Sequence, residues 1–321
     1  MQSTPGGIEQ LLRGDKRAVA RAISEVENDT LQARDILKRV YGRTGRAYRI
    51  GVTGPPGAGK STLTNKLARY YRSNKLTVGI IAVDPTSPFT GGALLGDRVR
   101  MSEVELDDGV FIRSMASRGS LGGLSKKAKE AADVLDAAGY DIIILETVGV
   151  GQSELDIAGA ADTTIVVLVP ESGDGIQAMK AGLMEIADFF VLNKADRPGA
   201  DQAVMSLKMI LGFRSPDAES WMADVVKTQA SEGKGIEDVA AIVQRHRSSL
   251  EKTGALAKKR RARLERRIRE IVDDQLHTDF WDDQRSRELH EKLDLLFQRQ
   301  SNPYDVAADL IKDFRATNLK S

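Results

Sequence analysis

The chain has 321 residues, of which 41% are hydrophobic and 29% are charged, a balance typical of a globular protein with a substantial core. Its 47 Lys and Arg residues nearly cancel its 46 Asp and Glu residues, so the net charge indicates no bias toward nucleic acid or a membrane surface. The lack of cysteine excludes disulfides, thiolate nucleophiles and thiolate metal sites, and no apolar run approaches the roughly 20 residues of a membrane helix.

The first segment, from about residue 8 to 41, carries apolar side chains near helical spacing and predicts helix. Its start lacks the apolar core of a signal peptide, and its acidic residues are atypical of a transit peptide, so we expect a cytoplasmic protein. Residues 42–45, Gly-Arg-Thr-Gly, interrupt the pattern and predict a linker. The expected N-terminal helical segment therefore spans residues 1–46.

The middle segment, residues 47–247, alternates short apolar runs with longer helical stretches, which predicts an α/β domain. Several runs lack polar alternation, as expected of strands that helices cover on both faces of a mainly parallel sheet. The predicted strands lie at 49–52, 78–83, 110–112, 142–145, 164–169 and 189–192.

A phosphate-binding loop follows the first predicted strand, because residues 54–61 match G-x-x-x-x-G-K-[ST] and precede a helical stretch. The glycines let backbone N–H groups turn toward phosphate oxygens at a helix N-terminus, Lys60 would reach the β- and γ-phosphates, and Ser61 would bind Mg²⁺. The alternative is a glycine-rich turn with a chance lysine. The predicted nucleotide contacts are Gly54, Pro55, Pro56, Gly57, Ala58, Gly59, Lys60, Ser61 and Thr62.

Carboxylates follow two later strands and one loop, where they are candidate Mg²⁺ partners. Asp84 ends a strand, Asp97 lies in a loop, and for both the alternative is capping of a turn. Glu146 begins Glu-Thr-Val-Gly, in the place of the D-x-x-G of ordinary GTPases, and the N–H of Gly149 would approach a γ-phosphate.

The expected hydrolysis is slow, because Val150 follows Gly149 where small GTPases often carry a water-orienting glutamine. Gln152 is a candidate substitute.

A base-reading site is predicted by Asn193-Lys194-Ala195-Asp196, which follows a strand and resembles the N-K-x-D motif of GTPases. An aspartate at the last position accepts hydrogen bonds from guanine, whereas adenine would leave it unpaired, so GTP is preferred over ATP. The alternative is a strand end followed by a helix cap. Residues 228–236 resemble the loop whose backbone N–H contacts guanine O6, which adds Gln229 and Ala230 to the set.

The last segment, residues 248–321, is helical, with basic residues beside an apolar stripe that runs from Leu264 to Leu276. Asn302-Pro303 predicts the start of the final helix, with asparagine as the cap. The basic run at 258–269 suggests RNA as an alternative partner, but acidic residues follow it, which favours a solvated helix face.

Several longer sequence segments resemble those of one protein family. They are GPPGAGKST, VDPTSPFTGGALLGDRVRM, FIRSMASRGSLGGLS, ILETVGVGQSE, GDGIQAMKAGLMEIAD and NKAD. Together they resemble MeaB and the methylmalonic aciduria type A protein, a family once labelled as arginine/ornithine transport kinases.

The resemblance implies a SIMIBI-type P-loop GTPase that binds GTP or GDP with Mg²⁺ and acts as a chaperone of adenosylcobalamin-dependent methylmalonyl-CoA mutase. The mutase would stimulate hydrolysis, residues 248–321 would form a dimerisation arm of a homodimer, and residues 171–180 would form a mobile loop facing the partner. No nucleic acid or membrane partner is implied. The implied catalytic residues are Lys60, Glu146, Gly149 and Asp97, and the implied metal partners are Ser61, Asp84, Asp97 and Glu146.

Two other classes remain open at this point. A small-molecule kinase would use the same phosphate loop but has no need of N-K-x-D. A maturation GTPase for another metalloenzyme also fits, although such proteins usually carry cysteine or histidine clusters. The cobalamin-binding D-x-H-x-x-G pattern is absent from the sequence, so the cofactor is expected to stay on the client enzyme.

Overall fold

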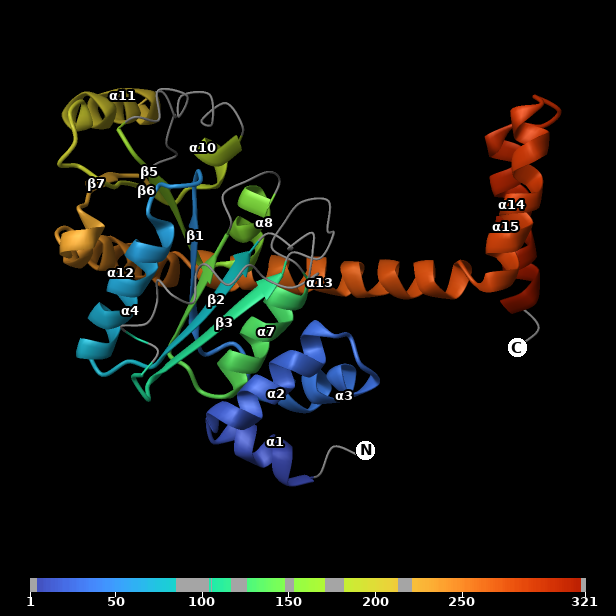
Figure 1. Ribbon diagram of the computed structural model, residues 1–321, viewed down its shortest axis with the longest axis horizontal. Coiled ribbons are helices and arrows are strands. Elements are labelled where there is room, and N and C mark those ends of the chain that lie inside the picture. The colour runs from blue at the N-terminus through green and yellow to red at the C-terminus, as the bar shows by residue number, and fades with distance from the viewer. Residues whose placement is uncertain are drawn as a thin grey trace. The chain divides into compact units, whose positions relative to one another are not determined.

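The computed structural model describes residues 5–84, 104, 106–116, 126–147, 153–170, 182–212 and 221–318. The chain divides into two compact units, Met1–Lys259 and Arg260–Ser321 (Figure 1). The strands are β1 (Tyr48–Thr53), β2 (Val78–Asp84), β3 (Val110–Ala116), β4 (Ile142–Glu146), β5 (Thr163–Leu168), β6 (Phe189–Leu192) and β7 (Val225–Lys227). The helices are α1 (Pro5–Leu12), α2 (Lys16–Glu27), α3 (Leu31–Val40), α4 (Lys60–Ser73), α7 (Lys126–Ala137), α8 (Ser153–Ala160), α10 (Met184–Ile186), α11 (Ala200–Gly212), α12 (Ile236–Lys252), α13 (Ala255–Phe280), α14 (Asp283–Phe297) and α15 (Pro303–Asn318), with 3₁₀ turns η1 (Tyr41–Arg43) and η4 (Ala230–Glu232).

The first unit is built on a parallel sheet in the order β3-β2-β4-β1-β5-β6-β7. The predicted α/β fold with a mainly parallel sheet is confirmed, and each of the six predicted strands is present. The seventh strand, β7, was not predicted because its three residues are too few to show a pattern. Since the strands are parallel, their carboxyl ends share one edge of the sheet, where ligands of such folds bind.

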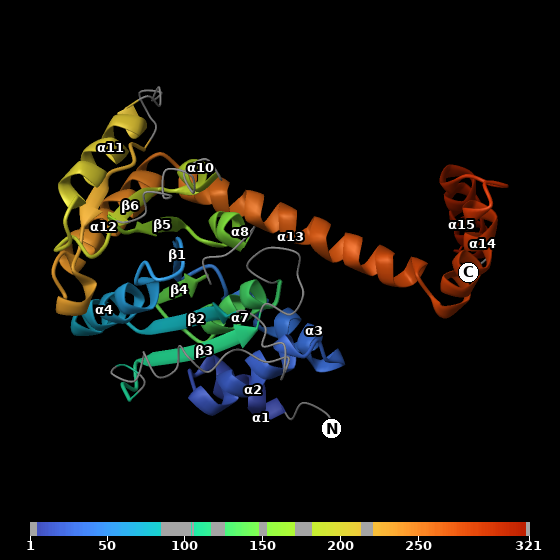
Figure 2. The ribbon, with the colours of Figure 1, turned by 45° about the horizontal axis from the view of Figure 1, so that its top comes forward.

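Helices cover both faces of the sheet, which explains the continuous apolar runs (Figures 1 and 2). On β4, Ile143 and Leu145 belong to the core that α7 and α8 cover, whereas Ile142 and Ile144 belong to the core that α4 and α12 cover. A third core packs β5 and β6 against α11. Because successive side chains of a strand point to opposite faces of the sheet, one strand contributes residues to two cores.

Two strand glycines let helices approach the sheet closely. A Cβ at Gly51 would lie 2.8 Å from Ile157 Cγ1 of α8, and a Cβ at Gly79 would lie 2.8 Å from Leu135 Cδ1 of α7. Both distances are shorter than any normal carbon contact, so these positions favour glycine for packing.

The N-terminal segment forms three helices and a 3₁₀ turn, whereas the sequence predicted one helical stretch from about residue 8 to 41 before the linker. Asp15 accepts from Ala18 N (2.7 Å) at the start of α2, and Thr30 accepts from Ala33 N (3.3 Å) at the start of α3. These side chains accept hydrogen bonds from N–H groups in the first turn of a new helix. They therefore start a new helix at points where the spacing of apolar residues continues unchanged. The buried face of α2 joins the core that α7 covers.

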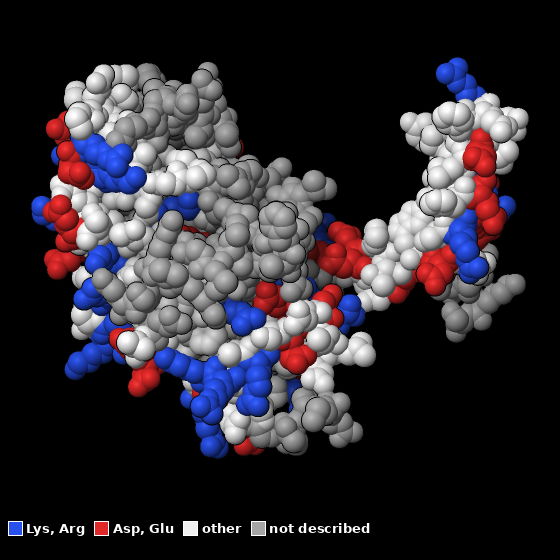
Figure 3. Space-filling model, viewed as in Figure 1, with Lys and Arg blue, Asp and Glu red and all other residues white. Residues whose placement is uncertain are grey.

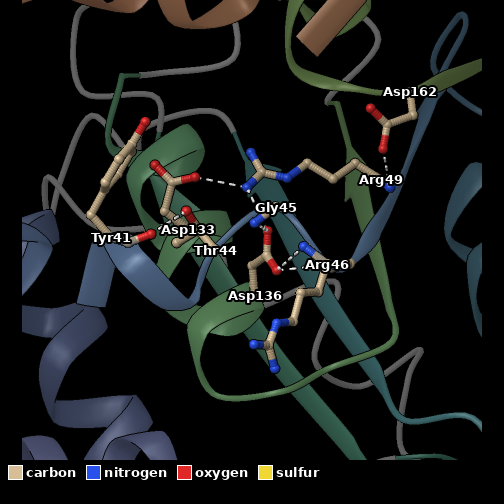
Figure 4. Close-up of polar contacts among 9 residues, drawn as sticks. Tyr41, Thr44, Gly45, Arg46, Arg49, Asp133, Asp136 and Asp162 are labelled. Carbon is tan, nitrogen blue, oxygen red and sulfur yellow. Dashed lines mark hydrogen bonds and ion pairs between the residues drawn. The ribbon is translucent and has the colours of Figure 1, made fainter. Parts of the chain in front are cut away.

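The linker into β1 is held by a buried carboxylate (Figure 4). Asp136 of α7 accepts from the backbone N–H groups of Gly45 (2.8 Å), Arg46 (3.0 Å) and Ala47 (3.0 Å). The Arg49 guanidinium lies between Asp136 (3.3 Å) and Asp133 (2.7 Å). One side chain thereby fixes the start of β1 against α7.

The second unit contains α14, α15 and the later part of α13. The Arg285 guanidinium lies over the rings of Phe280 (5.7 Å) and Phe314 (4.9 Å), a cation–π arrangement that joins the helices. Asn302 Oδ1 accepts from Tyr304 N and Asp305 N, both at 3.0 Å, so the predicted cap of the last helix is confirmed. Across the described part of the chain, no helix is both long and apolar enough to cross a membrane.

Candidate functional site

The loop between β1 and α4 requires glycine at two positions. Gly54 has φ +133°, and a Cβ there would lie 2.1 Å from Val167 O of β5. Gly59 has φ +90°, and a Cβ there would lie 2.2 Å from Asn193 Nδ2. Because left-handed backbone and lack of space coincide, the loop passes close to two other elements and delivers its N–H groups to the N-terminus of α4.

Lys60 is buried at the first position of α4. Its Nζ donates to Gly54 O (2.8 Å) and Pro55 O (3.0 Å), so the ammonium lies over the loop. A cation held among inward-facing N–H groups is suited to oxygens of a di- or triphosphate. The remaining predicted contacts, Pro56, Gly57, Ala58 and Thr62, lie in the same loop and the first turn of α4.

A hydroxyl and a carboxylate meet beside this loop. Ser61 Oγ donates to Glu146 Oε1 at 2.6 Å, joining the first turn of α4 to the carboxyl end of β4. Mg²⁺ prefers oxygen ligands of this kind, so both residues fit a metal held next to phosphate oxygens. The pairing of Ala82 with Glu146 brings the end of β2 alongside, and Asp84 is its last residue.

Other predicted residues lie outside the described part of the chain. They are Asp97, Gly149, Val150, Gln152, the loop at 171–180 and the side chain of Asp84.

The base-reading motif is tied to the phosphate loop and to the loop after β7. Asn193 Nδ2 donates to Ala58 O (2.8 Å), while Asn193 Oδ1 accepts from Thr228 Oγ1 and from Ala230 N, both at 3.0 Å. A buried amide with all these bonds fixes three segments relative to one another. The sequence indicated Asn193 as a base contact, but it did not indicate this bridging role or the part of Thr228.

Exposure increases along the rest of the motif, from half-buried Lys194 and Ala195 to exposed Asp196. Lys194 has φ +56°, Ala195 N donates to Thr228 O (3.0 Å), and Asp196 is exposed. Across the rim, Gln229 N donates to Lys234 O (3.1 Å). The Glu232 carboxylate raises the pKa of Lys234, and Asp196 acts in the same direction, so Asp196 and Lys234 lie near each other.

The structure therefore gathers the phosphate loop, the Ser61–Glu146 pair, the base motif and the Gln229–Ala230 turn at the carboxyl ends of β1, β4, β6 and β7. This arrangement offers N–H groups and a lysine to phosphates, oxygens to a metal, and an exposed carboxylate to a base. These are the chemical requirements of a nucleoside triphosphate site.

Comparison with known proteins agrees with this geometry. The family described as "Methylmalonyl Co-A mutase-associated GTPase MeaB" matches residues 19–285. A "Putative GTPase" of Pyrococcus abyssi is 49% identical over 308 residues, which cover 95% of each chain. The mitochondrial methylmalonic aciduria type A homolog of Caenorhabditis elegans is 31% identical over 305 residues, covering 89% of this chain and 76% of the homolog.

Among solved structures, that of an LAO/AO transport system kinase superposes with a TM-score of 0.74 at 27% identity and covers 97% of each chain. The agreement thus extends through the flanking helices as well as the sheet. The matches in sequence and in structure cover far more than half of the chain, and the chain belongs to the MeaB family of methylmalonyl-CoA mutase-associated GTPases.

Proposed function

We propose that this GTPase is a chaperone of an adenosylcobalamin-dependent acyl-CoA mutase, with methylmalonyl-CoA mutase as the client, and that it protects the enzyme and gates loading of its cofactor. Family membership supports the client, because the family is described by its association with that mutase. The single structural observation that carries the nucleotide part is the joining of the phosphate loop to the base motif through Asn193.

Each residue has a separate task in the proposed cycle. Backbone N–H groups of the non-proline residues of the phosphate loop hold the phosphates together with Lys60. Asp196 selects guanine, and the loop that carries Gln229 and Ala230 contacts guanine O6. Ser61 and Glu146, with Asp84 and Asp97, would hold Mg²⁺, which supplies positive charge against the phosphate oxygens when bound. Gly149 would sense the γ-phosphate, so its release would shift the protein to a form with different affinity for the mutase.

The second unit is proposed to form the contact of a homodimer. Leu264, Ile268, Ile271, Val272 and Leu276 of α13 are 46–62% exposed, and they repeat at helical spacing. An exposed apolar stripe of this length is typical of an interface between chains.

A nucleic acid partner is not part of the proposal. Acidic and basic side chains are interspersed over the face shown in Figure 3. Within the basic run, Arg269 pairs with Glu265 (2.8 Å) and Arg267 with Glu270 (3.7 Å). Paired charges of this kind favour a solvated helix face over a phosphate-binding strip.

The decisive experiment measures GTP and ATP hydrolysis by the purified protein, alone and with an adenosylcobalamin-dependent mutase from the same source. We expect slow turnover of GTP only, and a rise of at least about tenfold with the mutase, a threshold well below the roughly 10³- to 10⁵-fold effect of a partner that supplies an arginine. Asp196→Asn is the matched control, because it should lose the preference for guanine while keeping the phosphate contacts. GTP turnover that no such mutase stimulates would contradict the chaperone role, and phosphate transfer to a small molecule would favour a kinase.

A further inference from the structure

The two loops that we assign to the base are each carried by a straight element. β6 runs from Phe189 to Leu192 and leads into Asn193, and α12 begins at Ile236, directly after the Gln229–Lys234 turn. At the site, the loops are joined by the bonds of Asn193 to Ala230 N and of Ala195 N to Thr228 O. The relative position of β6 and α12 therefore decides how the two loops meet.

A second connection joins the same two elements away from the base-reading loops. Asp188 immediately precedes β6, and His246 lies on α12, with His246 Nε2 at 3.5 Å from Asp188 Oδ1. From Asp188 to Asn193 the chain advances by five residues, roughly 16 Å as strand. From Ile236 to His246 it advances by ten residues, roughly 15 Å as helix. These two stretches have matched lengths and are connected at both ends, and α12 continues beyond them to Lys252.

His246 is held in one orientation by its neighbours. Its ring is 1% exposed and packs on Trp221, with ring centroids 4.7 Å apart. A carboxylate only accepts, so Nε2 carries the proton toward Asp188 while Nδ1 accepts from Thr163 Oγ1 (2.8 Å). Thr163 Oγ1 in turn accepts from Tyr48 Oη (2.6 Å), which extends the connection to β5 and β1.

Asp188 is a junction for several elements. Its carboxylate accepts from Thr164 N (2.7 Å) and pairs with Lys259 Nζ (3.4 Å), and its backbone carbonyl accepts from Trp221 Nε1 (2.6 Å). Lys259 belongs to α13, which carries neither base-reading loop. The contact from His246 to the Asp188 carboxylate, in contrast, joins β6 to α12, the two elements that carry the base-reading loops.

We propose that Asp188 and His246 are positioning residues for guanine binding, because they fix β6 against α12 and thereby set the distance between the two base-reading loops. This inference rests on the proposed assignment of those loops to guanine. Neither residue touches the nucleotide, so loss of the pair weakens binding of the base without changing the phosphate chemistry.

The test compares four proteins, the wild type, His246→Phe, His246→Gln and Lys259→Met, by titration with a fluorescent GDP analogue and by kcat at saturating GTP. His246→Phe keeps a ring against Trp221 but loses the contact with Asp188 and the hydrogen bond with Thr163. Its Kd for GDP should therefore rise about 3- to 10-fold while kcat stays within about twofold, the size of effect typical of residues that act through packing. His246→Gln keeps a donor for Asp188 and an acceptor for Thr163, so it should retain wild-type affinity. Lys259→Met should also retain it.

The controls separate the possible failures. Equal affinity in folded His246→Phe would overturn the positioning role, as would an equal loss in Lys259→Met, because the junction would then act as general scaffold. If thermal melting shows that His246→Phe is unfolded, Asp188→Ala tests the same pair from the other side with the same expected loss. Wild-type protein that binds GDP and ADP equally would instead contradict the assignment of the base-reading loops.

Discussion

Gly57 and Gly59 lie in the same loop with the same left-handed backbone, yet their surroundings differ. At Gly57, with φ +73°, a Cβ would have nothing within 4 Å. At Gly59, with φ +90°, a Cβ would meet Asn193 Nδ2, the group that bridges to Ala58 O. Conformation alone restricts the first position, whereas conformation and space both restrict the second.

This difference gives a matched pair of substitutions. Gly57→Ala should cost only the strain of a left-handed alanine, about 1 kcal/mol, and weaken GDP binding by no more than about tenfold. Gly59→Ala should also displace Asn193 and weaken GDP binding by at least about a hundredfold, because two loops then lose their common partner. Isothermal titration with GDP measures both, and similar affinities for the two variants would contradict the bridging role.

His246 makes stability depend on pH. Burial lowers the pKa of its imidazole below the ordinary value of 6.5, so the folded protein keeps the ring neutral. Below pH 6.5 the unfolded chain takes up the proton first, and the free energy of unfolding should fall by up to about 1.4 kcal/mol per pH unit until the folded-state pKa is reached. Above pH 6.5 this contribution is complete. Urea unfolding between pH 5 and 7.5 measures it, and the same slope in His246→Gln would assign the effect to other groups.

Single residues show what sequence can and cannot predict. Lys60 and Ser61 were predictable because the motif fixes them within one loop, and their local geometry depends on few other segments. The partners of Asn193 and His246 lie on other elements, so no spacing in the sequence predicts them. His246 in particular drew no functional prediction, because an isolated histidine gives no pattern.

At the scale of elements, Asp136 connects the linker, β1 and α7. Its side chain is 1% exposed and accepts from three consecutive N–H groups, while that of Asp133 is 37% exposed and pairs with Arg49. The two carboxylates of α7 therefore differ in burial and in the number of hydrogen bonds that depend on them.

Removing them one at a time should have unequal effects. Asp136→Ala leaves three N–H groups without their acceptor and the buried Arg49 guanidinium with Asp133 alone, so it should lower the free energy of unfolding by about 3 kcal/mol. Asp133→Ala should cost about 1 kcal/mol or less, as for a partly exposed ion pair. Denaturant unfolding of the two variants provides the comparison, and equal losses would show that the linker does not depend on Asp136.

Helices and strands were predicted well where a long apolar pattern marks them, and poorly where a few residues determine where an element begins or ends. The strands from β1 to β6 follow from apolar runs, and helix α15 follows from its cap. The division of the N-terminal segment depends on Asp15 and Thr30, which cap new helices inside a continuing apolar pattern. The spacing of apolar residues reveals the buried face of a helix, but it does not reveal a chain break between two helices that share the same buried face.

At the scale of the whole molecule, the first unit contains every described residue of the nucleotide site. A chain ending at Lys259 keeps that compact unit and the Asp188–Lys259 pair while lacking most of α13 and all of α14 and α15. It should bind GDP with unchanged affinity and be a monomer, because the exposed apolar stripe is gone. Light scattering after size exclusion measures the mass, and a dimer of the shortened chain would place the interface elsewhere.

The central place of β1 in the sheet also determines when the site can form during synthesis. β1 pairs with β4 and β5, and Ala58 O meets Asn193 across 135 residues of chain. Contacts this distant form late and slowly, since a long loop must close before they contribute. The nascent phosphate loop therefore lacks Asn193 and Ala230 until these residues have left the ribosome, whereas β1 can already pair once β4 and β5 have been made.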